Sequence, residues 1–361
     1  RLRRAQAYPR VTDHVDDMLT LAKRLQEKGF AYEKLRSVYF DISRFKGYGA
    51  LSQVALDKIR LGKTVDLDDY EKDNPCDFTL LKRAKLAELK QGLSYATEWG
   101  HVRPSWHLEC AAMALQHFGE TLDIITGGAN LIFPHHENVM AICEAATGKP
   151  LARYWLHNEP VLETKLSGTD AREPITVRQV LNSGVAGADL RYLLLATHYR
   201  KTLHLSPEAL ESARRSRKRL DLFLERLSRV QDGQPSPDLP EHLTALTGDF
   251  MAALDDDLNI AGALAALFNF QREMNTRMDQ GRLDEAGAKA ILDQFREFDQ
   301  VLGVMDFPLT AEDAAIAAKL QEREVARQQQ DWARADQLRQ EMAAQGIEIL
   351  DTATGPIWRR Q

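Results

Sequence analysis

Apolar residues between positions 101 and 206 recur with two different periods. Helical spacing predicts helices at about 106–118, 135–147, 176–182 and 187–197. Short apolar runs at Leu122–Ile125 and Tyr154–His157 predict strands between them. Helices that alternate with strands are typical of an α/β layer built on a parallel sheet. We therefore expect an α/β layer over residues 101–206.

The first hundred residues have a less regular pattern. Apolar positions at helical spacing predict a helix over 13–29 that ends at Gly29. Val38–Ile42 predicts a strand, and Lys46–Gly49 a turn after it. Residues 53–75 are highly charged and predict exposed, mixed structure. We expect residues 1–100 to form an inserted mixed α/β segment together with the start of the following layer.

After Pro207 the pattern is helical. A Gly- and Pro-containing linker at 232–240 separates a helix at 207–230 from three more, at 241–254, 258–279 and 284–302. This predicts a helical bundle over 207–310. Residues 311–344 return to a helical pattern and the tail predicts a hairpin, so we expect a small C-terminal domain over 311–361. The fold class is α/β plus all-α.

Composition narrows the class of protein. Hydrophobic residues make up 44% and charged residues 28%, which is typical of a soluble globular chain. No apolar run reaches the roughly 18 residues of a membrane span, and no charged-then-apolar leader opens the chain. Three widely spaced cysteines favour reduced thiols in a cytoplasmic protein. The chain begins with Arg1, so we expect the natural chain to begin further upstream.

Two predicted helix starts carry potential metal donors. Cys110 stands near the start of the helix over 106–118, and His135 opens the next helix. Thiolate and imidazole are the usual zinc ligands, and His107 lies one helical turn from Cys110. A tetrahedral site needs four donors, so a half-buried thiol and helix-cap histidines are an equally simple interpretation.

Two loops could approach phosphate groups. Gly127 and Gly128 follow a predicted strand, where a ligand can come close to the backbone. Lys165 and Ser167 lie in a polar loop, from which a lysine could neutralise phosphate charge during nucleotidyl transfer. Both segments also fit ordinary turns and solvated loops.

The helix predicted at 207–230 carries five positive charges in the six residues Arg214–Arg219. Net charge is −6, so the whole chain does not indicate a nucleic-acid partner, and a local cluster matters more. Arg214, Arg215, Arg217 and Lys218 could contact a phosphate backbone. The alternative is a solvated helix face.

Together, the motifs resemble bacterial cysteinyl-tRNA synthetases, which are class I aminoacyl-tRNA synthetases. The resemblance covers nearly the whole chain, and several blocks are specific to this family. The matching blocks are Pro9–His14, Val38–Ile42, Arg103–Cys110, Leu131–Asn138, Glu144–Gly148, Ala152–Asn158, Ala196–Arg200 and Asp331–Asp336. The resemblance implies that residues 101–206 are the second half of a nucleotide-binding catalytic domain, and that the bundle over 207–310 is like the family's tRNA-binding region.

The resemblance also implies chemistry. The family activates cysteine with ATP, transfers it to tRNA, and selects the cysteine thiolate with zinc. The zinc ligands that match this chain are Cys110 and His135, and the matching tryptophan of the cysteine pocket is Trp106. His107 and Asn130 are expected beside the substrate. Lys165 and Ser167 match the family's Lys-Met-Ser-Lys-Ser loop, which stabilises the ATP phosphates.

The sequence departs from the family at several of these points. Val139 stands where the family has a zinc-ligating Glu, and the family's His-Ile-Gly-His signature and first zinc Cys do not occur in the chain. Ile125 and Asn130 replace the His and Asp of a glycine-rich turn. Gly168 replaces the second lysine of the signature loop. Zinc and ATP are therefore expected for the family and are in question in this chain.

Two functions of different class follow. The first is a paralogue that has lost standard cysteine activation and keeps nucleic-acid binding, to tRNA or DNA, with a role at DNA or RNA ends. The second is an ATP-dependent cysteine–tRNA ligase whose first half is missing from this chain. Ligases that join cysteine to sugars are a weaker third option, because they keep both signatures and the zinc site. The pattern gives no oligomeric state.

Overall fold

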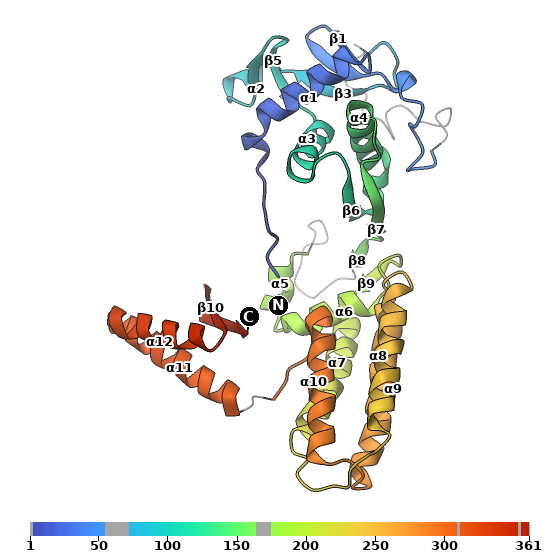
Figure 1. The fold of residues 1–361 in the computed structure, drawn as a ribbon. Coiled ribbons are helices and arrows are strands. Elements are labelled where there is room, and N and C mark those ends of the chain that lie inside the picture. Colours follow the sequence, from blue (N-terminus) through green and yellow to red (C-terminus); the bar gives the residue numbers. More distant parts are fainter. Residues whose placement is uncertain (1–2, 55–71, 164–174, 309–310, 353–354, 361) are drawn as a thin grey trace. The chain divides into compact units, whose positions relative to one another are not determined.

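The computed structural model describes residues 3–54, 72–163, 175–308, 311–352 and 355–360. It divides into two compact units (Figure 1). The first contains residues 1–211 and 258–261, and the second contains residues 212–257 and 262–361. The four-part division expected from the sequence stays a prediction.

The first unit contains a five-stranded antiparallel sheet, which the sequence indicated only at its second strand. Its spatial order is β1-β2-β3-β5-β4. The strands are β1 (Ala31–Lys34), β2 (Ser37–Phe40), β3 (Phe78–Arg83), β4 (Tyr95–Thr97) and β5 (Gly100–Pro104). The short helix α2 (Leu86–Lys90) lies between β3 and β4, and 3-10 turns cover Val11–Asp13 and Ile42–Arg44.

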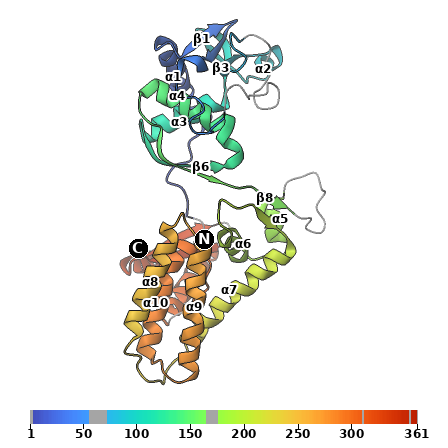
Figure 2. The same ribbon diagram turned by 90° about the vertical axis from the view of Figure 1, so that its right-hand side faces the viewer.

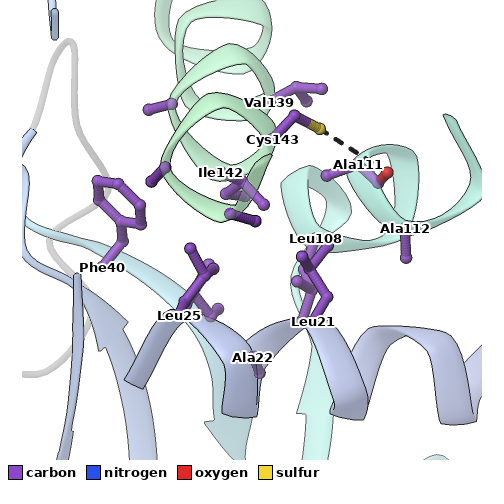
Figure 3. Close-up of a cluster of buried hydrophobic side chains, with 14 of the residues drawn as sticks. Leu21, Ala22, Leu25, Phe40, Leu108, Ala111, Ala112, Val139, Ile142 and Cys143 are labelled. Carbon is purple, nitrogen blue, oxygen red and sulfur yellow. Dashed lines mark hydrogen bonds between the residues drawn. The ribbon is translucent and has the colours of Figure 1, made fainter. Parts of the chain in front are cut away.

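Three helices pack with this sheet around one apolar core. They are α1 (Val15–Glu27), α3 (Trp106–Phe118) and α4 (Glu137–Thr147). Leu25 of α1, Phe40 of β2, Leu108 of α3 and Ile142 of α4 are fully buried together (Figure 3). Each buried side chain of this size contributes about 1.5–3 kcal/mol of hydrophobic stabilisation. The core therefore holds α3 and α4, which carry the candidate site, in a fixed arrangement.

Two pairs of parallel strands confirm the α/β class. One pair is β6 (Leu122–Gly128) with β7 (Ala152–Asn158), and the other is β8 (Val161–Glu163) with β9 (Leu203–Leu205). The connection from β6 to β7 runs through the turns Ala129–Leu131 and Ile132–His136 and then through α4. Helices α5 (Val177–Asn182) and α6 (Gly187–Ala196) separate β8 from β9.

The second unit contains the expected bundle. Its helices are α7 (Pro207–Leu227, within this unit from Ser212), α8 (Leu239–Asp255), α9 (Ile260–Asp279) and α10 (Glu285–Leu302). Both views show α8, α9 and α10 side by side (Figure 2). Phe295 of α10 contacts Phe223 of α7 and Phe270 of α9, with ring centroids 5.5 and 6.1 Å apart. These aromatic contacts join the helices, and the prediction of helices alone over this stretch is confirmed.

The helical pattern expected over 311–344 is confirmed, and the chain forms two helices there. These are α11 (Ala311–Gln328) and α12 (Trp332–Ala344). Gln330 between them has φ of 60°, a left-handed conformation that interrupts the helix without a Gly or Pro to announce it. The expected hairpin is confirmed as β10 (Ile347–Thr352) and β11 (Gly355–Arg360).

Two further observations concern the cysteines and the apolarity of the helices. Cys76, Cys110 and Cys143 are free thiols. Within the described ranges, no helix combines the length and apolarity that a bilayer crossing requires. The cytoplasmic location expected from the sequence stays a prediction.

Candidate active site and nucleic-acid interface

A cavity of about 370 Å³ lies in the first unit, where the antiparallel sheet meets α3 and the segment before α4. It collects most of the residues that the sequence singled out for substrate binding. Trp106, His107, Asn130 and His135 all line it. Its other lining residues are Tyr48, Lys72, Cys76, Phe78, Thr79, Ser105, Leu131, Pro134 and Asn138.

Trp106 contacts one of the two expected metal donors. Ser105 caps α3 by accepting a hydrogen bond from the Leu108 amide at 3.3 Å, which sets Trp106 at the first helical position. The indole stacks on the His135 ring, with centroids 3.9 Å apart, and Cys110 lies one helical turn further along α3.

Cys110 is not among the residues that line the cavity, and its thiol and the two cavity imidazoles, His107 and His135, are uncharged near neutral pH. Burial, with a smaller effect of the Glu109 charge, raises the pKa of the Cys110 thiol to about 11. Burial lowers the pKa of His107 to about 4, and it lowers that of His135 to about 4 with help from the His107 charge. The two imidazoles share a hydrogen between their Nδ1 atoms, 2.9 Å apart. Both can act as neutral donors or acceptors to a ligand.

A second histidine pair continues away from the cavity. Nδ1 of His136 lies 2.7 Å from Nε2 of His157 on β7, and its ring also contacts Trp155. Burial lowers the pKa of His136 to about 4, and the His157 charge adds to this. His157 was not singled out from the sequence, although its position at the end of a predicted strand is a signal that could have found it.

The glycine pair after β6 makes room for the protein's own side chains. A Cβ on Gly127 would lie 2.5 Å from Cε1 of His136, and a Cβ on Gly128 would lie 2.4 Å from Oδ1 of Asn130. The close approach expected at this turn is therefore made by His136 and Asn130. Asn130 is exposed at the cavity.

Glu137 and Asn138 hold one wall of the cavity in place. The Glu137 carboxylate is fully buried and accepts hydrogen bonds from the amides of Gly49 and Ser52, at 2.8 and 2.7 Å. Asn138 accepts a short hydrogen bond from the Tyr48 hydroxyl. These contacts join α4 to the turn after β2. Sequence reasoning missed them, because the partners lie almost ninety residues away in the chain.

The basic cluster on α7 is not uniform. Arg214, Arg215 and Lys218 are exposed on the helix. The Arg217 side chain is only 13% exposed, and it pairs with Asp221 at 2.8 Å and with Asp306 at 2.7 Å. Arg219 lies over the Phe268 ring of α9, 4.9 Å from its centroid. Arg217 and Arg219 therefore contact other parts of the bundle, and Arg219, like Arg214, Arg215 and Lys218, is also exposed.

Comparison with known proteins decides the family. A family model described as the tRNA synthetases class I (C) catalytic domain matches residues 1–215, and one described as the DALR domain matches residues 249–306. A cysteine–tRNA ligase from Methanosarcina acetivorans is 39% identical over 363 residues, which cover 98% of this chain and 76% of the ligase. For the ligase from Chlamydia pneumoniae the identity is 40% over 361 residues, with coverage of 98% and 75%.

The chain belongs to the cysteine–tRNA ligase family. Solved structures agree on the fold. A structure assigned as an arginyl-tRNA synthetase from Campylobacter jejuni has a TM-score of 0.51 at 12% identity, covering 84% of this chain and 64% of that one. A methionyl-tRNA synthetase from Mycobacterium tuberculosis with bound methionyl-adenylate has a TM-score of 0.50 at 13% identity, covering 76% and 66%. These likenesses establish a class I synthetase fold.

The residues of this cysteine–tRNA ligase relative do not fit the zinc ion of its family. Val139, at the position of the family's Glu, is 5% exposed and packs in the core beside Ile142 and Cys143 (Figure 3). His135 is engaged by Trp106 and His107. Among the described residues, no three His, Cys, Asp or Glu side chains are arranged to hold a metal. Lys165 and Ser167, expected to contact ATP, lie outside the described residues.

Proposed function

We propose that this chain is a cysteine–tRNA ligase relative that binds nucleic acid, tRNA in the first place, and no longer activates cysteine. The observation that carries the proposal is the buried Val139 at the position where the family has a zinc-ligating Glu. A valine cannot coordinate a metal, which leaves Cys110 and His135 as the donors that match the family's set. Without a closed metal site, the pocket has no thiolate coordination with which to select cysteine.

The nucleotide side of the site supports the same proposal. Ile125 packs against the apolar core, where the family has a polar histidine. Asn130 offers an amide with two N–H donors, where the family has an acceptor-only carboxylate. Gly168 supplies no charge at the position of the family's second signature lysine. Charge on the phosphates in the transition state needs donors placed in advance, and these positions no longer provide them.

Nucleic-acid binding rests on the exposed part of α7. Arg214, Arg215 and Lys218 place three cations within two turns of one helix. Such a cluster binds phosphate groups by releasing counterions. The relatives named above are tRNA ligases, and a DALR model matches the neighbouring helices, which makes tRNA the first partner to test.

The alternative function is ATP-dependent cysteine–tRNA ligation. Its support is the identity of 39–40% to cysteine–tRNA ligases over 98% of the chain. This function requires catalysis to tolerate the residues at four substituted positions, which are Ile125, Asn130, Val139 and Gly168. The residues of a catalytic constellation act as a unit, so partial retention is expected to leave little activity.

Cysteine-dependent exchange of pyrophosphate into ATP tests the loss of activation. We expect no exchange above background for the purified full chain, with a cysteine–tRNA ligase that exchanges as the positive control. Exchange that requires cysteine and disappears in Lys165→Ala would overturn the proposal and establish the alternative.

An electrophoretic shift assay tests nucleic-acid binding, with tRNA and with single- and double-stranded DNA as probes. We expect tRNA to shift, and affinity to fall at least tenfold in Arg214→Glu/Lys218→Glu, because charge reversal removes phosphate contacts. Arg282→Glu/Lys289→Glu reverses two exposed charges elsewhere in the second unit and should bind like the parent chain. Equal affinity in both variants would refute the α7 interface. If a labelled DNA or RNA becomes shorter during the assay, the chain also processes nucleic-acid ends.

A further inference from the structure

Outside the cavity, the first unit brings together two histidines that no function above uses. His14 immediately precedes α1, and His117 lies in the last turn of α3, 103 residues later. Their Nε2 atoms face each other at 3.3 Å, and their ring planes meet at 68°. We propose that His14 and His117 form a binding site for a divalent transition-metal ion on the surface of the first unit, with Asp17 orienting His14.

The separation of the two nitrogens fits a shared metal. Zinc–nitrogen bonds of about 2.0–2.1 Å at a tetrahedral angle put two ligand nitrogens roughly 3.3–3.4 Å apart. The observed 3.3 Å therefore allows an ion to replace the shared proton with little movement of either ring. Imidazole nitrogen is a ligand that nickel, copper and zinc all accept.

Asp17 provides an independent sign of a ligand histidine. Its Oδ2 lies 2.8 Å from Nδ1 of His14, so the carboxylate accepts the Nδ1 hydrogen. This bond fixes the tautomer in which Nε2 of His14 carries a lone pair toward His117. A carboxylate that holds the far nitrogen of a metal-bound histidine is a recurring arrangement, and it makes the histidine a stronger ligand.

Exposure makes the site accessible. The His14 side chain is 12% exposed and held in place, whereas His117 is exposed. Within the described part of the chain no third His, Cys, Asp or Glu ligand joins this pair, so the proposed site takes water as its remaining ligands. The site is therefore an open, exchangeable one. By the general order of divalent affinities, it should bind nickel more tightly than cobalt or manganese.

Titration of the chelator-treated full chain with nickel chloride, followed by calorimetry, tests the site. We expect one ion per chain, and nickel-edge X-ray absorption should show two imidazole ligands. His14→Ala and His117→Gln should each weaken binding at least tenfold, and Asp17→Asn should weaken it by about 10–100-fold. His204→Ala removes an exposed histidine elsewhere and should leave binding unchanged.

Circular dichroism of each variant checks folding, and the exposed His117 gives a variant in which unfolding is not expected. Nickel binding that is equal in His14→Ala, His117→Gln and the parent chain would show a plain histidine–histidine hydrogen bond and overturn the proposal. Nickel binding that is lost in Cys110→Ala but kept in both histidine variants would place the ion at Cys110, and would overturn the proposal equally.

Discussion

At the scale of single residues, neighbouring side chains explain what several motif positions do in this chain. Gly127 leaves space for the His136 ring, and Val139 fills the core where its relatives have a metal ligand. Trp106 stacks on the His135 ring at the start of α3. Each of these contacts can be tested by changing one residue.

Gly127→Ala should destabilise the first unit by about 1–3 kcal/mol, because the added methyl would lie 2.5 Å from Cε1 of His136 and force the ring to move. Gly248→Ala is the matched control. It lies on the exposed side of α8 with no atom within 4 Å of the added Cβ, and it should stabilise by up to about 1 kcal/mol. Urea denaturation measures both. A neutral Gly127→Ala would contradict the described packing.

The sequence predicted these site residues unevenly. Spacing indicated that Cys110 and His135 stand at the starts of two helices of one α/β layer, and their convergence on one metal stays a prediction. It could not reveal the contact between Glu137 and the Gly49–Ser52 turn, because nothing local to either segment encodes it. The sequence also could not show that Arg217 differs from the neighbouring basic residues, because its partner Asp306 is 89 residues away in the chain.

At the scale of elements, α7 carries a residue that holds the bundle together and an exposed cation at neighbouring positions. Arg217 joins the helix to the segment after α10 through Asp306, whose own amide donates to Asp221 at 2.9 Å. Lys218, the next residue, is exposed. The helix therefore combines a residue that holds the bundle together with one that is available to a partner.

Substitution separates the two roles. Arg217→Ala should lower the free energy of unfolding of the bundle by about 1–3 kcal/mol, because it leaves Asp221 and Asp306 without their shared cation. Its affinity for tRNA should stay within twofold of the parent chain. Lys218→Ala should do the reverse, weakening tRNA binding without changing the urea midpoint. Equal effects of both variants on affinity would show that Arg217 also contacts the nucleic acid.

Secondary-structure prediction succeeded where the helical period repeats over a long segment. The helix expected at 106–118 is the observed α3, whereas β1, β3, β4 and β5 went unrecognised. These strands have three to six residues each, too few to establish a period among charged neighbours. The break at Gln330 was missed because Ala, Gln and Arg on both sides all favour helix.

At the scale of the whole molecule, the buried histidines predict an acid-sensitive fold. His107, His135 and His136 have pKa values of about 4 in the folded chain, below the ordinary value of about 6.5 for an unfolded chain. Between these values the unfolded chain binds more protons. Stability should therefore be complete above pH 6.5 and fall as pH decreases toward 4.

Urea denaturation between pH 4.5 and 8 measures this dependence. His107 takes up one proton when the chain unfolds in this pH range. This uptake makes the free energy of unfolding change by up to about 1.4 kcal/mol per pH unit. His107→Gln should flatten the curve below pH 6.5, and His204→Gln, at an exposed position, should not. Identical curves for the parent chain and His107→Gln would show that His107 does not titrate with folding.

The bond between Glu137 and the Gly49–Ser52 turn has a consequence for how such chains are recognised. The Leu131–Asn138 block is among the segments by which this chain resembles the ligases, yet two of its residues, Glu137 and Asn138, hold a distant turn in place. Selection for folding alone would preserve those two residues whether or not a chain activates cysteine. The match at these two positions is therefore explained by folding alone, and the adjacent Val139, whose side chain makes no such bond, is the more informative position for cysteine activation.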